Sequence, residues 1–158
     1  MLLSWAQTVD ANSFVKTMRE IAWIGAMINV AHLVALAVFF GALLVVDLRL
    51  LGTGLTREPL AEVADQAHPW LIGGFVGLVL TGIPQLALQP LKEYYSELFN
   101  MKMQIMAVAI LFTFIVRARI THADEAGLGP VLPKLAAVAS IALWLAVAIP
   151  ARLIGLVG

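Results

Sequence analysis

The chain has 158 residues, of which 61% are hydrophobic, and its ten basic and ten acidic residues give a formal net charge of zero. Only 13% of the residues are charged, against about 25% in average globular proteins, so the polar surface of a water-soluble domain is missing. The neutral charge balance argues against a nucleic-acid partner, which requires a basic face. The absence of cysteine excludes disulfides, thiolate-bound metals and thiol catalysis. The composition therefore predicts an all-α integral membrane protein whose first partner is the lipid bilayer.

The first 20 residues differ both from a signal peptide and from a membrane span. Asp10, Asn12 and Ser13 interrupt the apolar positions too early for a signal peptide. Apolar residues nevertheless recur at helical spacing from Leu2 to Ile21, with polar residues between them. We therefore expect residues 1–20 to form an amphipathic helix that lies at the membrane interface.

Four later segments are apolar enough to cross a bilayer, whose core of ~30 Å requires about 20 helical residues. The expected spans cover about residues 21–46, 70–91, 99–120 and 135–151. They predict a four-helix bundle that forms a single domain. Thr56 to Pro59 predict the start of a short amphipathic helix before the second span, and Pro90 predicts a tight turn after it. Basic residues divide evenly between the two sides, so the positive-inside rule does not decide the orientation.

A histidine near the middle of the first expected span is the first candidate functional residue. Polar side chains within a span are costly and commonly functional. The neutral imidazole of His32 needs a hydrogen-bond partner or a metal, and the expected partner is either Asn29, one turn earlier on nearly the same face, or a backbone group. Two uses stay open, a structural contact between helices and a ligand bond to a cofactor. No acidic residue accompanies the histidines at the spacing of a dedicated metal site.

Lys102 is the second unusual residue because it falls inside the third expected span. Either it extends toward the headgroups, or it offers a cation to a buried carboxylate such as a heme propionate. His68, at the start of the second span, is either an interfacial residue or a second ligand to heme iron. Met106, one turn deeper than Lys102, is the alternative second ligand.

Charged residues also cluster at one end of the expected bundle. Asp47 and Arg49 end the first span, and Arg117 and Arg119 end the third span on the same side. We expect a structural ion pair between Asp47 and one of the two arginines of the third span, closing that end of the bundle.

Gly73 and Gly77 form a GxxxG pattern in the second span. Such a pattern is typical of close helix packing or oligomerisation. The alternative is that a flat macrocycle lies against this glycine face, and the sequence does not separate the two.

Several short runs of the chain carry a resemblance to known families: Ala31-His32-Leu33, Asp47-Leu-Arg-Leu-Leu-Gly52, Pro69-Trp70-Leu71, Thr81-Gly82 and Phe99-Asn100-Met101-Lys102. Together they resemble a bacterial family of small four-helix membrane proteins known as a domain of unknown function. More distantly, the central histidine and the lysine that opens the third span resemble copper-resistance-D and HemJ-type membrane proteins. HemJ-type proteins are heme-binding protoporphyrinogen oxidases. This second resemblance implies His32 as a heme ligand and Lys102 as a cofactor or propionate contact.

The first function expected from these observations is that of a small cytochrome b-like protein. It would hold heme b within the four-helix bundle of a multi-pass protein of the bacterial inner membrane, and it would exchange electrons with a membrane redox partner. The second is a non-redox accessory or structural subunit, in a homo-oligomer or a larger membrane complex. The third is an oligomeric transporter or channel for a small solute. The sequence leaves open whether the protein is an enzyme.

Overall fold

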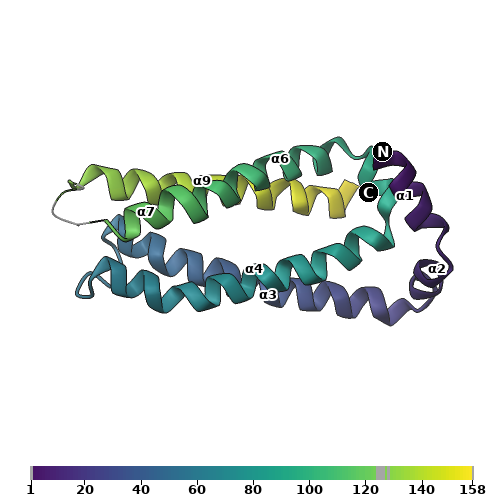
Figure 1. The fold of residues 1–158 in the computed structure, drawn as a ribbon, viewed down its shortest axis with the longest axis horizontal. Helices are drawn as coiled ribbons and strands as arrows, with labels where there is room; N and C mark the ends of the chain where they lie inside the picture. Colours follow the sequence, from purple (N-terminus) through teal and green to yellow (C-terminus); the bar gives the residue numbers. More distant parts are fainter. Residues whose placement is uncertain (1, 124–126, 128, 158) are drawn as a thin grey trace.

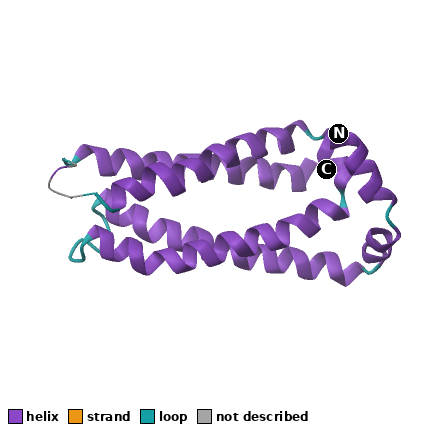
Figure 2. Ribbon diagram, in the orientation of Figure 1, coloured by secondary structure: helices purple, strands orange, loops and turns teal. Residues whose placement is uncertain are grey.

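The computed structural model describes residues 2–123, 127 and 129–157, and the regular secondary structure within these residues is entirely helical (Figures 1 and 2). Helices that are long and apolar enough to cross a membrane cover Trp23–Leu51, Leu60–Leu88, Glu97–Thr121 and Val131–Ala151. They lie side by side along the long axis and alternate in direction (Figure 1). The all-α fold with four spans is thereby confirmed, and the chain is a multi-pass membrane protein.

The first two spans form helices longer than the sequence predicts: α3 (Ala22–Leu51) and α4 (Leu60–Leu88). The expected short amphipathic helix after Pro59 is not separate but is the beginning of α4. The reason is that Leu60 and Leu71 belong to one buried stripe that continues past Pro69, which lies inside the helix. A proline removes a single backbone hydrogen bond, and burial of this stripe favours a continuous helix. A helix of 29 residues is ~43 Å long, so its ends extend beyond a ~30 Å hydrocarbon core.

The third span is composite and the fourth begins early. The third contains α6 (Glu97–Leu111), a π-helical segment η1 (Phe112–Arg117) and α7 (Ala118–Thr121). The π-helical segment was not expected from the sequence. The fourth span, α9 (Val131–Val157), begins before the predicted residue 135. Pro133 falls within its first turn, where a missing N–H costs no helical hydrogen bond.

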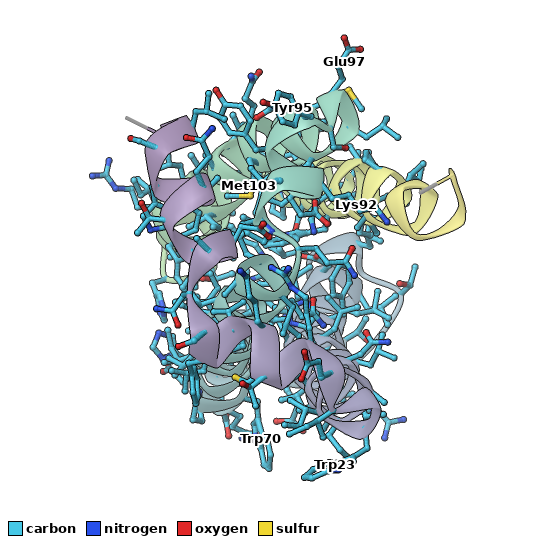
Figure 3. All side chains as sticks on the ribbon, turned by 90° about the vertical axis from the view of Figure 1, so that its right-hand side faces the viewer. Trp23, Trp70, Lys92, Tyr95, Glu97 and Met103 are labelled. Carbon is cyan, nitrogen blue, oxygen red and sulfur yellow. The ribbon has the colours of Figure 1, made fainter. Side chains whose placement is uncertain are left out.

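Two short helices replace the single interfacial helix expected over residues 1–20. They are α1 (Leu2–Ala11) and α2 (Ser13–Glu20). Asn12 separates them because its side chain accepts a 2.9 Å hydrogen bond from the backbone N–H of Phe14 and so caps α2. Both helices cross one end of the bundle (Figure 3), and α1 packs against α5 (Pro90–Tyr95), a helical turn where a tight turn was expected.

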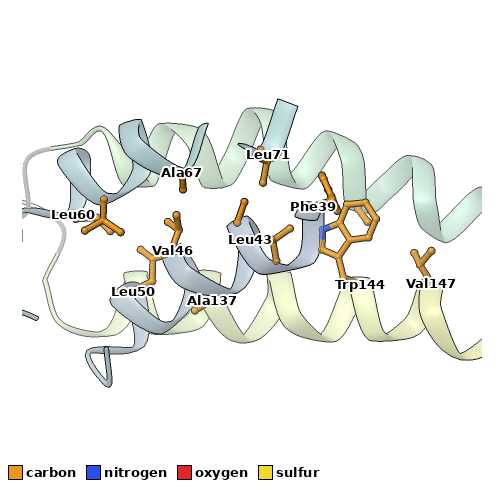
Figure 4. Packing of buried hydrophobic residues seen from close by; sticks show 13 residues of the cluster. Phe39, Leu43, Val46, Leu50, Leu60, Ala67, Leu71, Ala137, Trp144 and Val147 are labelled. Atoms are coloured by element: carbon orange, nitrogen blue, oxygen red, sulfur yellow. The ribbon is translucent and has the colours of Figure 1, made fainter. Parts of the chain in front are cut away.

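The four spans pack as two helical hairpins, α3 with α4 and α6 with α9. The hairpins approach each other toward the end of the bundle that is remote from α1 and α2, and they diverge toward α1 and α2 (Figure 1). Aromatic rings join the hairpins: the ring centroids of Phe39 and Trp144 lie 4.7 Å apart, and those of Phe75 and Phe114 lie 5.4 Å apart. Most of the buried apolar core lies between this aromatic layer and the end of the bundle remote from α1 and α2, here called the closed end, and Val147 lies on the other side of Trp144 (Figure 4).

A glycine sets the closest approach between α3 and α4, but it is Gly74 rather than Gly73. A Cβ atom on Gly74 would lie 2.6 Å from the backbone nitrogen of Phe39, and one on Gly77 would lie 3.0 Å from the Cβ of Ala35. A Cβ atom on Gly73 would meet nothing within 4 Å among the described residues. The contact face is therefore formed by Gly74 and Gly77. Because α3 lies against Gly77, close helix packing accounts for that glycine, while the space beside Gly73 is open among the described residues and a macrocycle there stays a prediction.

Candidate functional site

The His32 side chain on α3 is held by α4. Its Nδ1 lies 2.7 Å from Oγ1 of Thr81, and the hydroxyl of Thr81 lies 2.6 Å from the carbonyl oxygen of Gly77. When the single hydroxyl proton of Thr81 is donated to that carbonyl, Oγ1 accepts from His32 Nδ1. In that tautomer the neutral ring carries its proton on Nδ1, and the lone pair of Nε2 is left for another partner.

Glycine completes this contact. A Cβ atom built on Gly82 would lie 3.5 Å from Cε1 of His32. The imidazole ring thus packs beside a position that has no side chain, while it remains only half-buried. A threonine followed by a glycine within an apolar span is visible in the sequence. Nothing in the sequence, however, indicates that these two residues contact His32.

Asn29 is not the partner of His32, contrary to the prediction. Its Oδ1 accepts a long contact of 3.5 Å from Nε2 of Gln85 on α4. The reason is that α4 packs directly against α3 and supplies Thr81 at the level of His32. Two polar contacts thus connect α3 and α4 in the part of the bundle where the hairpins diverge.

Lys102 approaches the same region from α6. Its ammonium group is close enough to the His32 ring and to the Glu93 carboxylate of α5 for electrostatic interaction. Nζ lies 6.0 Å from the ring centroid of Phe99. Within the described part of the chain, no acceptor is hydrogen-bonded to this half-buried ammonium. A cation and an imidazole from different hairpins therefore lie within electrostatic range of each other.

The two expected second ligands lie at different depths. His68 precedes Thr81 by 13 residues on α4, which corresponds to ~20 Å along the helix axis. His68 therefore lies too far from His32 to bind the same iron, and the bis-histidine arrangement is wrong. Met106 is half-buried and packs against the core. Met106 precedes Phe114 by eight residues, and His32 precedes Phe39 by seven residues. Both side chains therefore lie ~11 Å from the aromatic layer, at a similar depth in the bundle.

A second polar centre lies at the closed end of the bundle, where the structure brings Asp47 and Arg117 together. Nε of Arg117 donates to Oδ1 of Asp47 at 2.8 Å, and Nη2 donates to the carbonyl oxygen of Leu43 at 2.9 Å. The hydroxyl of Ser140 donates to the other carboxylate oxygen of Asp47 at 2.8 Å. This network joins α3, η1 and α9, and the side chains of Asp47 and Arg117 are only 0% and 6% exposed.

The other two arginines expected at this end have different environments. Arg119 is exposed. Nε of Arg49 donates to the carbonyl oxygen of Glu58 at 2.8 Å, in the connection between α3 and α4. Ser140 was missed by the sequence analysis, although a serine in an apolar span is itself a signal of a hydrogen-bond partner elsewhere in the bundle.

The donor groups of the described residues suit some cofactors better than others. In residues 2–123, 127 and 129–157, no group of three or more histidine, aspartate or glutamate side chains lies together as a metal site. A heme requires only one or two protein ligands to its iron. A single imidazole with one ring nitrogen hydrogen-bonded to Thr81 fits that requirement, because a ligating histidine commonly donates its other ring N–H to a fixed acceptor.

The fold places the chain in the class of multi-pass four-helix membrane proteins, with a histidine–threonine pair between its first two spans. Within that class the chain belongs to the group described as "Family of unknown function (DUF6644)", whose model matches residues 2–157. No curated protein and no solved structure matches the chain.

Proposed function

We propose that the protein is a small cytochrome b-like membrane protein in which His32 binds heme b through Nε2. The observation that carries the proposal is the contact of Nδ1 with Thr81, because the tautomer in which Nδ1 donates to Thr81 has an unprotonated Nε2. The resemblance to HemJ-type proteins supports the same histidine. It also supports a location in the bacterial inner membrane, where one-electron transfer to a membrane redox partner would take place.

The residues around His32 have distinct parts in this proposal. Thr81 orients the ring and keeps the proton on Nδ1. Gly82 lies beside the ring, where a Cβ atom would be in van der Waals contact with Cε1. Lys102 would pair with a carboxylate at the edge of the macrocycle, because its ammonium lacks a hydrogen-bonded acceptor among the described residues. Bound heme would supply one-electron chemistry at its iron. Met106 is the remaining expected second ligand.

The first test is the absorption spectrum of the protein purified in mild detergent from heme-replete cells. We expect Soret and α bands in the dithionite-reduced wild type. We expect these bands to be lost in His32→Ala, because Nε2 is removed. The matched control is His68→Ala, which should retain the wild-type spectrum because His68 lies ~20 Å away along α4. A colourless wild type, or an unchanged spectrum in His32→Ala, would contradict the proposal, and the colourless result would favour the accessory-subunit function.

A second prediction concerns the orientation of the ring. Thr81→Val keeps the shape of the side chain but removes the acceptor for Nδ1–H. We expect heme affinity to fall about 10–100-fold, as is usual when the outer partner of a metal-ligating histidine is lost. Titration of heme into apoprotein measures the effect, and Thr17→Val, on exposed α2, is the control. Equal affinities in Thr81→Val and wild type would show that Thr81 does not position His32.

A further inference from the structure

A small cavity lies beside the buried ion pair, outside the His32 site. Its volume is about 90 Å³, which corresponds to roughly three water molecules. It lies where α4 meets the third span, and the side chains that line it and can donate hydrogen bonds are those of His68, Thr113, Arg117, Thr121 and His122. The remaining lining residues are apolar, so no carboxylate lines this cavity among the described residues.

Arg117 has donors that the ion pair does not use. A guanidinium carries five N–H groups, of which Asp47 and the Leu43 carbonyl accept one each. The other N–H groups have no acceptor among the described residues, although the side chain is only 6% exposed. No buried side-chain nitrogen or oxygen of the described residues lacks a hydrogen-bond partner, so the Arg117 nitrogen without an acceptor reaches accessible space, and Arg117 lines the adjacent cavity. Its unused N–H groups are therefore able to donate to an oxygen ligand in that cavity.

Asp47 does not compete for this role. One of its oxygens accepts from Arg117 and the other from Ser140, and the residue does not line the cavity. Thr113 adds a further donor, because its oxygen accepts from Nε1 of Trp144 at 3.0 Å and its own proton has no acceptor among the described residues. At the rim, the carboxylate of Asp65 lies 3.9 Å from the ring of exposed His122.

The depth of the cavity indicates the source of such a ligand. Arg117 precedes Thr121, the end of the third candidate span, by four residues, or ~6 Å of helix. His68 and His122 are exposed, so the cavity opens near the end of the spans. Lipid phosphates lie at this level of a bilayer, and arginine is a common phosphate ligand.

We propose that this cavity binds a phosphate group, held by the unused N–H groups of Arg117 and by the hydroxyl of Thr113. The phosphate comes from a phospholipid headgroup or from free phosphate. Because Arg117 is held by Asp47 and Leu43, the site is organised before the ligand arrives, and binding requires little rearrangement of the arginine.

The test uses the full chain, delipidated in a non-ionic detergent, and leaves the ion pair intact. Ala64→Leu places additional carbon atoms in the cavity wall, and Ala61→Leu makes the same change at an exposed position of α4 outside the cavity. Melting temperature and bound phosphorus are measured in the presence of phosphatidylglycerol in mixed micelles or of inorganic phosphate. Diacylglycerol serves as the lipid without a phosphate group. If Ala64→Leu does not fold, Ala118→Leu fills the same cavity from the third span.

We expect phosphatidylglycerol to stabilise wild type and Ala61→Leu, and to bind at least tenfold more weakly to Ala64→Leu. Stabilisation by phosphatidylglycerol alone identifies a lipid headgroup as the source, and stabilisation by inorganic phosphate as well identifies the free ion. Equal binding to Ala64→Leu and Ala61→Leu, equal stabilisation by diacylglycerol, or binding of neither phosphate source would overturn the proposal.

Discussion

Replacing Asp47 with Asn is expected to destabilise the protein by about 3–5 kcal/mol, because it leaves the guanidinium of Arg117 buried without its counter-charge. Asp47 is fully buried and accepts hydrogen bonds from both Arg117 and Ser140. The substitution therefore weakens the contacts that α3 makes with the third and fourth spans. Thermal or denaturant unfolding in detergent, followed by circular dichroism, measures the effect.

Two controls separate the ion pair from general effects of charge. Arg119→Gln removes an exposed charge at the same end and should change the free energy of unfolding by no more than about 0.5 kcal/mol. The double variant Asp47→Leu/Arg117→Met should be markedly more stable than Asp47→Asn, because apolar side chains of similar size can replace a buried pair. Wild-type stability in Asp47→Asn would contradict the proposed role of the network.

Gly74→Ala is expected to destabilise the packing of α3 on α4 by about 1–3 kcal/mol, the usual effect of overpacking. The new Cβ would lie 2.6 and 2.7 Å from the backbone N and Cα of Phe39, which are not free to rotate away. The helices must therefore separate around the aromatic layer. The free energy of unfolding in detergent again measures the change.

The adjacent glycine supplies the matched control for this prediction. Gly73→Ala introduces a Cβ atom with nothing within 4 Å among the described residues. Alanine has the higher helix propensity, so this variant should be neutral or slightly more stable than wild type. If Gly73→Ala is the more damaging of the two, the packing face assigned to Gly74 and Gly77 is wrong.

Several features of the fold could be predicted because they depend on local composition. Runs of apolar residues identify all four spans, and the amphipathic pattern of residues 1–20 predicts a helical N-terminal segment. The boundaries were less accurate. The predicted second and fourth spans began at residues 70 and 135, just after Pro69 and Pro133, but packing of the neighbouring apolar residues keeps α4 continuous through Pro69, and the first turn of α9 tolerates Pro133.

The candidate sites could be predicted only as single residues. His32, Lys102, Asp47 and Arg117 stand out because polar side chains are costly in an apolar span. Their partners come from helices distant in sequence: Thr81 is 49 residues from His32, and Ser140 is 93 residues from Asp47. A single sequence contains no information on such pairings.

The sequence by itself thus determined that this is a four-span helical membrane protein, because composition and hydrophobic run length set the cost of exposing each segment to water. Only the tertiary structure decided which face of each helix meets which neighbour. That choice selected Gly74 over Gly73 for close packing, Thr81 over Asn29 as the partner of His32, and Arg117 over Arg119 as the partner of Asp47. The physical reason is that residues one or two positions apart on a helix point in different directions, so only the packing of the helices decides which of them meet.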